Sequence, residues 1–285
     1  MQLLLLVLIL AFTVQTCSAA YERWSFPNWN SYKGKSSTSW RKAWNIPKST
    51  GWSWPDNDSN NKIVYNPVKS KKDSVLEVTY PKGSVNPQGT PQGGIGFYAQ
   101  PIKLRREAKL VVLEYQVYFP KRFNFVKGGK LPGLYGGHQG CSGGASASTC
   151  FSTRFMWRRE GAGEVYAYLP ESKQRKSLCD EKGNICNPNY GYSLGRGAWS
   201  FQTGEWTTVR QTLKLNTPGK ENGVVRIDVN GKKVYSESKL VFLSKNTGQV
   251  VGIAFHTFFG GNGGDWASPK KQNTFFRGFK LQALY

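Results

Sequence analysis

The stretches FSTRFMWR (Phe151–Arg158) and EVYAYL (Glu164–Leu169) lie on either side of a short turn at residues 159–163. In both stretches, aromatic and aliphatic residues alternate with polar ones, which is typical of β-strands. Because successive side chains of a strand point to opposite faces, the even-numbered residues of each stretch share one face. The two stretches are therefore predicted to form a β-hairpin within a sheet.

The expected register gathers the polar side chains of this hairpin on one face. If the turn closes the hairpin directly, the cross-strand pairs are Arg158–Glu164, Met156–Tyr166 and Arg154–Tyr168. That face then carries arginine, two phenols and the hydroxyl of Ser152, and it is too polar for the interior of a sandwich. We interpret it as the floor of a groove. A shift by one residue would separate Arg154 from the tyrosines.

The same period-two pattern recurs along most of the chain. Further strands are predicted at Val75–Tyr80, Lys109–Phe119, Thr207–Leu215, Val224–Val229, Lys233–Tyr235, Val250–Phe255 and Phe275–Leu284. Asn230-Gly231 is a strong signal for a type I′ hairpin turn. No segment combines adequate length with a helical period, so helices should be few. These features predict an all-β fold, a β-jelly roll sandwich of two antiparallel sheets with a groove on one sheet.

The composition supports one folded unit after a leader. The chain has 285 residues, 39% of them hydrophobic, so wholesale disorder is excluded. The apolar run Leu3–Phe12 is too short to span a membrane, and small residues follow it up to Ala20. Residues 1–20 are interpreted as a signal peptide, and the protein is expected to be secreted. With no repeat and no long linker, residues 21–285 are expected to form a single catalytic domain.

The segment at residues 21–62 is rich in tryptophan. Its indoles are Trp24, Trp29, Trp40, Trp44, Trp52 and Trp54. They could form a platform for stacking sugars, or they could cover an open face of the main fold. We favour the second interpretation.

Four cysteines remain after the leader, which suggests two disulfides in a secreted chain. Sequence neighbours pair most readily, as Cys141–Cys150 and Cys179–Cys186. A zinc site is disfavoured because neither spacing is CxxC-like and the chain has only two histidines. Asn57-Asp58-Ser59 is a glycosylation sequon, whose use the sequence does not decide.

The charge is extreme, with 39 Lys and Arg against 17 Asp and Glu and a formal net charge of +22. Such a surface attracts polyanions. Export makes nucleic acid an unsuitable partner, and no later stretch could cross a bilayer. An acidic polysaccharide is the expected partner.

Glycines surround two lysines between Lys127 and His138. A phosphate-binding loop is excluded, because Leu-Pro-Gly follows Lys130 where such a loop needs Ser or Thr and a helix. Glycines beside lysine would instead let the backbone and the ammonium approach a ligand closely. His138 and His256 are isolated and are interpreted as loop or core residues rather than as catalytic bases.

A basic groove with tyrosines suits β-elimination on a polyuronate. The reaction needs cations that neutralise the carboxylate, a base for the C5 proton and an acid for the departing O4. Tyrosine can act in both proton steps if positive charge from Lys130 and Arg154 lowers its pKa from about 10. Neither a metal nor an organic cofactor is required. A glycoside hydrolase is disfavoured, because it needs paired carboxylates and no Glu-x-Asp-x-x-Glu strand is present.

The run KGGKLPGL (Lys127–Leu134), followed by Ser152-x-Arg154 and Tyr166-x-Tyr168, resembles polysaccharide lyase family 14. This is the alginate lyase family of algae-grazing molluscs and of an algal virus. The resemblance extends from about Val75 to Tyr285. It implies a β-jelly roll and eliminative cleavage of alginate, usually in β-D-mannuronate blocks.

The resemblance also implies roles for individual residues. Lys130 would lie at the catalytic centre and stabilise the carboxylate and enolate, while Tyr166 and Tyr168 would transfer protons, with base and acid unassigned. Ser152 and Arg154 would bind the uronate. Lys127 and His138 would flank the site. A monomer without cofactor is expected.

Three alternatives stay open at this point. The chain could be a lyase for another polyuronate such as glucuronan, since the family includes such members. It could be a non-catalytic lectin for acidic glycans, which would bind through its basic face and its tryptophans. It could also be a basic defence protein that acts on anionic microbial surfaces. The cleavage mode, endo or exo, is not readable.

Overall fold

The computed structural model describes residues 21–36, 38–55, 59–68, 73–108, 110–187, 189–244 and 248–285. Over these residues the chain is almost entirely β-strand, with five short 3-10 segments. None of the described helices has the length and hydrophobicity to span a bilayer. The expected signal peptide and the sequon residue Asn57 lie outside the described residues.

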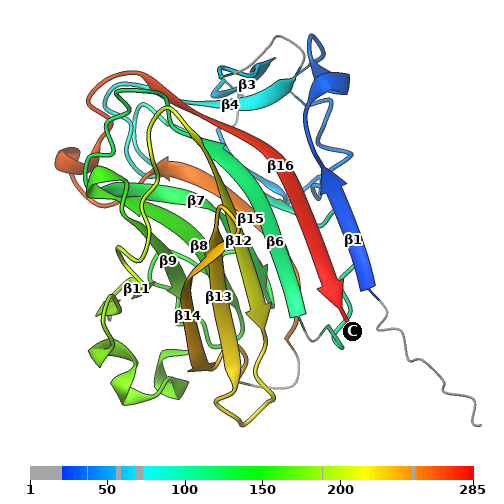
Figure 1. Ribbon diagram of the computed structural model, residues 1–285, viewed down its shortest axis with the longest axis vertical. Helices are drawn as coiled ribbons and strands as arrows, with labels where there is room; N and C mark the ends of the chain where they lie inside the picture. Colours follow the sequence, from blue (N-terminus) through cyan, green and yellow to red (C-terminus); the bar gives the residue numbers. More distant parts are fainter. Residues whose placement is uncertain are drawn as a thin grey trace, which may run out of the picture.

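Sixteen strands form two sheets of eight, which Figure 1 shows as two layers. The first sheet has the order β14-β13-β12-β6-β16-β4-β3, and β1 also pairs with β16. Its strands are β1 (Tyr21–Phe26), β3 (Asn61–Tyr65), β4 (Ser74–Tyr80), β6 (Leu110–Tyr118), β12 (Trp206–Lys214), β13 (Gly223–Val229), β14 (Lys232–Leu240) and β16 (Gln272–Leu284).

The second sheet has the order β10-β11-β9-β8-β7-β15-β5-β2. Its strands are β2 (Trp52–Trp54), β5 (Ile95–Ala99), β7 (Gly128–Gly136), β8 (Phe151–Arg158), β9 (Gly163–Tyr168), β10 (Ile185–Asn187), β11 (Gly191–Leu194) and β15 (Val250–Phe259). All the strand pairs in both sheets are antiparallel.

The predicted fold class is confirmed. Each of the nine stretches predicted as strands coincides with a strand of the structure, give or take its ends. Asn230 and Gly231 both have positive φ angles, 49° and 80°, as the expected type I′ turn between β13 and β14 requires.

Aromatic side chains from both sheets form the core between them. Tyr115 on β6 stacks on Phe279 with 5.0 Å between ring centroids, and it meets Phe155 on β8 edge-on at 6.0 Å. The tryptophan-rich segment enters the same core. Trp44 is fully buried and lies 5.6 Å from Phe97 on β5 and 4.8 Å from Phe279. The indole of Trp44 thus fills space between the two sheets and is not exposed for stacking sugars.

Strand β7 lies at the centre of the second sheet, although the sequence does not predict it. Glycine and proline are depleted in strands, and β7 contains several of them. A Cβ on Gly129 would lie 2.0 Å from the ring of Trp157, and one on Gly136 would lie 2.1 Å from the ring of Phe151. These two glycines therefore make room for aromatic rings of β8.

A β-bulge at Pro132 sets which side chains of β7 face outward. The register with β8 shifts between Leu131 and Gly133, and the carbonyl of Pro132 accepts a hydrogen bond from the Tyr115 hydroxyl at 3.0 Å. Bulges are the sites where a central strand tolerates proline. Because of the extra residue, Lys130 before the bulge and Tyr135 after it point to the same face.

Two disulfides join sequence neighbours, as predicted. Cys141 and Cys150 close the loop between β7 and β8, with 5.8 Å between their Cα atoms. Cys179 and Cys186 join a 3-10 segment (Lys176–Asp180) to β10, with 5.6 Å between their Cα atoms.

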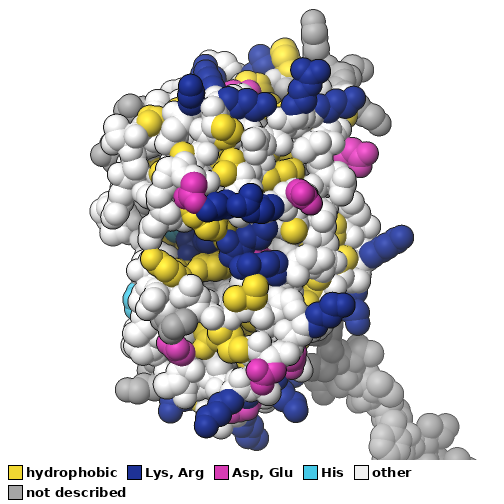
Figure 2. Space-filling model, turned by 90° about the vertical axis from the view of Figure 1, so that its left-hand side faces the viewer, with side chains coloured by type: hydrophobic (Ala, Val, Ile, Leu, Met, Phe, Trp, Pro, Cys, Tyr) yellow, Lys and Arg dark blue, Asp and Glu magenta, His cyan; other side chains and the backbone are white. Residues whose placement is uncertain are grey.

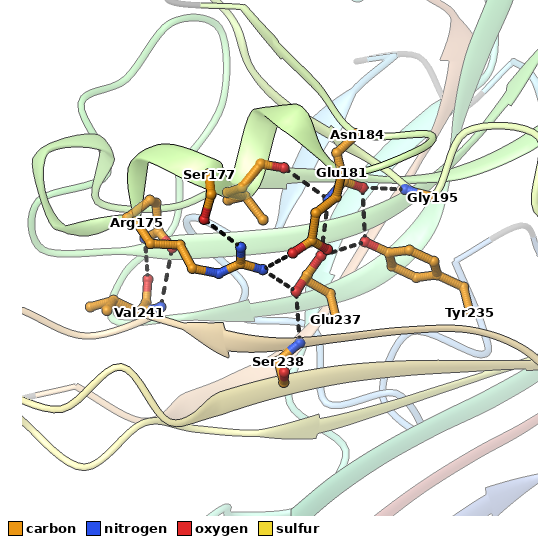
Figure 3. A network of polar contacts seen from close by, with 11 residues as sticks. Arg175, Ser177, Glu181, Asn184, Gly195, Tyr235, Glu237, Ser238 and Val241 are labelled. Atoms are coloured by element: carbon orange, nitrogen blue, oxygen red, sulfur yellow. Dashed lines mark hydrogen bonds and ion pairs between the residues drawn. The ribbon is translucent and has the colours of Figure 1, made fainter.

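A polar network joins the loop that holds the second disulfide to β14 (Figure 3). The guanidinium of Arg175 lies 2.5 Å from a carboxylate oxygen of Glu181 and 2.8 Å from one of Glu237. Glu237 is buried, and its other oxygen accepts a hydrogen bond from Asn184 at 2.9 Å. The network thereby ties the edge of the second sheet to the first sheet.

Replacement of Glu237 by alanine is expected to lower the free energy of unfolding by about 3 kcal/mol, because Arg175 and Asn184 would lose their buried acceptor. Urea unfolding at neutral pH measures the change. The control is Lys280→Ala, which removes an ion pair between a half-exposed lysine and Glu114 and should cost less than about 1 kcal/mol. Equal losses in the two variants would contradict this role of the network.

Candidate active site

Charged and polar side chains gather on the outer face of β7, β8 and β9, which points away from the first sheet. Figure 2 shows the side of the molecule on which β9 and β11 lie, with Lys and Arg side chains in a hollow near its middle. The facing pairs across neighbouring strands are Lys130 with Met156, Arg154 with Tyr166, and Ser152 with Tyr168. The structure thus brings together five of the side chains that the sequence singled out.

The register of the β8–β9 hairpin differs from the expected one by two residues. Arg154 lies opposite Tyr166 rather than Tyr168, because the strands pair up to Trp157 and Gly163 and a tight 3-10 turn connects them. A shift of two residues leaves every side chain on its expected face. The polar face predicted as a groove floor is therefore present, but each residue of β8 lies opposite a different residue of β9 from the one expected.

Lys130 is a buried cation that lacks a full counter-ion. Its Nζ atom lies 2.9 Å from the sulfur of Met156 and 3.5 Å from the ring centroid of Tyr166. Burial holds the pKa of Lys130 well below its usual range, and the positive charges of Arg154 and Arg158 add to this effect. A thioether and an aromatic face compensate an ammonium only weakly. A bound anion would complete its environment.

Arg154 is a second buried cation of this kind. Its side chain is almost fully covered, and its Nη1 atom donates a hydrogen bond of 3.2 Å to Nδ1 of His256. The Nε atom has no hydrogen-bond partner among the described residues. Burial lowers the pKa of this guanidinium, although nearby tyrosines counteract it. A buried cation without a partner carboxylate is costly, and an anionic ligand would relieve that cost.

The carboxylate of Glu164, next to this pair, is already neutralised. One oxygen lies 2.6 Å from Nη2 of Arg158, and the other accepts hydrogen bonds from Arg196 at 2.7 Å and from the hydroxyl of Ser193. Burial alone would raise the pKa of Glu164, but the two arginines lower it below its usual range. Arg158 and Glu164 thus form an ion pair, although Met156, and not Arg158 as predicted, lies directly opposite Glu164 in the sheet. Glu164 is therefore not free to serve Lys130 or Arg154.

The two tyrosines differ in their surroundings. Burial raises the pKa of Tyr166, and the neighbouring Tyr168 raises it further, so the Tyr166 phenol keeps its proton at neutral pH. This direction is opposite to the lowered pKa that the sequence suggested. The hydroxyl oxygen of Tyr168 accepts a hydrogen bond of 3.0 Å from the backbone N–H of Gly143, and the guanidinium of Arg154 lies 5.6 Å from its ring.

The loop closed by Cys141 and Cys150 borders the Tyr168 end of this face. The loop donates the hydrogen bond from the Gly143 N–H to Tyr168. Its Cys141 carbonyl accepts a hydrogen bond of 2.8 Å from the hydroxyl of Ser152. Cys141, Ala147 and Cys150 also pack around Tyr168. The first disulfide therefore holds in place a loop that contacts two site residues.

Lys127 and His138 lie at opposite ends of β7, outside this cluster. Lys127 forms an ion pair with Asp265. Asp265 lines a cavity of about 530 Å³, together with Lys82 and Arg159. His138 is exposed, and its ring nitrogens contact the carbonyl of Gln139 and the hydroxyl of Thr149. These contacts draw both side chains to neighbours other than the five clustered residues.

Sequence reasoning missed His256 as part of this face. The strand was expected to end at Phe255, whereas β15 continues to Phe259 and places His256 beside Arg154. Extending the period-two pattern past Phe255 would have put His256 on the same face as Ala254. Among the described residues, no group of three or more His, Cys, Asp or Glu side chains is arranged to hold a metal ion.

Comparisons with known proteins agree with this geometry. The family model of polysaccharide lyase 14 matches residues 68–279. The alginate lyase of Aplysia kurodai is 32% identical, with a TM-score of 0.78 over 90% of this chain and 97% of that one. The alginate lyase vAL-1 of a Chlorella virus is 24% identical, with a TM-score of 0.68 over 86% of this chain and 94% of that one, and it supports the fold alone.

A curated relative is the protein Exolysin of Paramecium bursaria Chlorella virus 1, which is 28% identical over 168 residues. The match covers 53% of this chain and 26% of the viral protein, so the chain spans about a quarter of that relative's length. The family model, by contrast, covers well over half of the chain, including every residue of the cluster on β7, β8 and β9. The chain belongs to polysaccharide lyase family 14.

Proposed function

We propose that this family 14 lyase is secreted and cleaves alginate, preferring mannuronate-rich stretches, by β-elimination at the 4-O-glycosidic bond. The observation that carries the proposal is the pair of buried cations, Lys130 and Arg154, which lie beside two tyrosines and lack a free carboxylate partner among the described residues. A uronate supplies the carboxylate that this face lacks. The similarity to the Aplysia alginate lyase supports alginate as the polymer.

The cations prepare the substrate for loss of its C5 proton. The uronate carboxylate binds between Arg154 and Lys130, and the negative charge that develops on it after proton loss is stabilised by both. An anion beside Lys130 also raises the pKa of the lysine, so the ammonium form is favoured in the complex. Lys130 thus stabilises the enolate more strongly than the neutral side chain would.

The two tyrosines carry the proton transfers, with Tyr168 as base and Tyr166 as acid. The Tyr168 oxygen, which the Gly143 N–H reaches at 3.0 Å, takes the C5 proton in its deprotonated form. The C5–H electrons form the C4=C5 double bond, and the C4–O4 bond breaks. Tyr166, which holds its proton tightly, donates it to the departing O4. Proton exchange with solvent restores both groups.

Three other side chains contribute to binding in this proposal. Ser152 borders the uronate from β8, next to Tyr168. Lys127 and His138 lie at the two ends of β7, where they contact sugars on either side of the cleaved bond. The net charge of +22 concentrates the polyanion near this face and makes binding sensitive to salt.

The first experiment follows near-ultraviolet absorbance, which rises only when elimination forms an unsaturated uronate. Purified chain from Tyr21 onward is mixed separately with poly-mannuronate, poly-guluronate and glucuronan. We expect the fastest rise on poly-mannuronate. If absorbance rose with glucuronan alone, the substrate would be glucuronan and not alginate. No rise on any polymer, with salt-sensitive binding retained, would favour the lectin alternative.

The pH dependence of kcat is expected to differ from that of kcat/KM. A tyrosine that acts as the base must first lose its own proton, so kcat should rise from neutral toward alkaline pH. In the free enzyme the lowered pKa of Lys130 means that the ammonium is lost as pH rises, so carboxylate binding weakens and kcat/KM should fall on its alkaline side. Initial rates from pH 5 to 10 measure both. A flat kcat over this range would contradict a phenolate base.

A further inference from the structure

His256 belongs to the site although its strand is not a neighbour of the strand that holds Arg154. Arg154 lies on β8 and His256 on β15, with β7 between them in the sheet. The residue of β7 directly opposite Arg154 is Gly133, and Ala254 lies opposite Gly133 on β15. A Cβ on Gly133 would lie 2.4 Å from the Cα of Arg154, so only glycine fits here between β7 and β8. The guanidinium of Arg154 reaches across β7 to the imidazole, where the 3.2 Å hydrogen bond is found.

The chemistry of this contact fixes the tautomer of His256. Arginine has only donors, so Nδ1 of His256 accepts the hydrogen bond and the proton of the neutral ring sits on Nε2. Burial lowers the pKa of His256 well below its usual range, and the charge of Arg154 lowers it further. The ring is therefore neutral, and it is an acceptor that does not cancel the charge of the guanidinium.

The surroundings of His256 hold its ring in one place. Its ring centroid lies 5.0 Å from that of Trp54 on β2 and 4.8 Å from that of Tyr98 on β5. The residue is 4% exposed, and its Nε2 atom has no hydrogen-bond partner among the described residues. The hydrogen bond from Arg154 is thus the polar contact that accounts for a histidine at this buried position.

We propose that His256 is a positioning residue, which holds the guanidinium of Arg154 through its neutral Nδ1 and leaves the other N–H groups of Arg154 for the substrate carboxylate. A carboxylate in the place of His256 would anchor Arg154 more tightly, but it would also neutralise the charge that must bind the uronate. A neutral acceptor orients the cation and preserves its charge. This inference rests on the proposed role of Arg154 in substrate binding.

The test is a double-mutant cycle with two substitutions of the histidine. His256→Leu removes the acceptor and keeps the bulk, and it is expected to lower kcat/KM about ten- to hundredfold, mainly through KM, as loss of a hydrogen bond to a charged group does. His256→Asn places an amide oxygen near the position of Nδ1 and is expected to stay within about threefold of the parent. In an Arg154→Ala background, His256→Leu should change kcat/KM less than about twofold.

Binding of a mannuronate tetrasaccharide, measured by calorimetry for the same variants, separates this inference from the proposed function. An inactive parent chain would reject the lyase proposal, and the binding cycle would still decide the role of His256. Equal effects of His256→Leu with and without Arg154 would overturn the inference. So would an asparagine variant that is as impaired as the leucine variant, because a purely structural histidine predicts both results.

Discussion

Replacement of Lys130 by alanine is expected to lower kcat by at least about a hundredfold, the scale on which enzymes lose a group that stabilises developing charge. The reason lies in the surroundings of the ammonium. Its neighbours, Met156 and Tyr166, offer no negative charge, so the interaction becomes strong only when the substrate carboxylate arrives. The stabilisation is then largest when charge builds up on the enolate.

The measurement is the initial rate of absorbance increase at saturating poly-mannuronate. Lys214→Ala is the matched control, because this lysine is exposed on β12 of the first sheet and should leave the rate unchanged. Lys130→Arg tests geometry, since it keeps the charge but places a larger planar group between Met156 and Tyr166. We expect Lys130→Arg to be impaired as well. An alanine variant with more than about a tenth of the parent rate would remove Lys130 from the catalytic set.

Phenylalanine in place of Tyr166 or of Tyr168 is expected to lower kcat by at least about a hundredfold in each case, because each change removes one of the two proton-transfer groups. The two variants should differ in their pH profiles. Tyr168→Phe removes the proposed phenolate, so any residual rate should lose its alkaline rise. Tyr166→Phe removes the proposed acid and should keep that rise.

Kinetics of both variants from pH 5 to 10 test the assignment, and Tyr65→Phe on the exposed end of β3 serves as the control. Reversed profiles would exchange the roles of base and acid. If one of the two variants kept near-parent activity, its tyrosine would have no part in proton transfer. The raised pKa of Tyr166, which keeps the proton on its phenol, is the structural reason for expecting this tyrosine to act as the acid.

Local patterns predicted much of this fold. The stretch Phe151–Arg158 was predicted with the bounds that β8 has, because its alternation is regular and a clear turn follows it. Strand β7 escaped prediction because its glycines are explained by close contacts with the neighbouring strand, such as the rings of Trp157 and Phe151 beside Gly129 and Gly136. Intrinsic propensity argues against such a strand, and packing across the sheet overrides it.

The site was predictable where its residues are close in sequence. Arg154, Tyr166 and Tyr168 belong to one hairpin, so alternation alone placed them on one face, even with the register displaced by two residues. The contact between Arg154 and His256 depends on the order of β8, β7 and β15 in the sheet. That order is set by pairings between distant parts of the chain, which local periodicity does not report.

The central position of β7 has a consequence for how the enzyme matures. On one side β7 pairs with β8, which follows it in the chain, but on the other side Lys130 lies opposite Phe258, which is 258 − 130 = 128 positions later. Hairpins between adjacent strands close quickly, whereas pairings over long separations are slow to form. A nascent chain that ends before β15 would carry the hairpin tyrosines without His256 and with β7 paired on one side only. If refolding is monitored by the recovery of enzymatic activity, the measured rate should therefore be that of the pairing of β15 with β7. This pairing should be slower than formation of the β8–β9 hairpin.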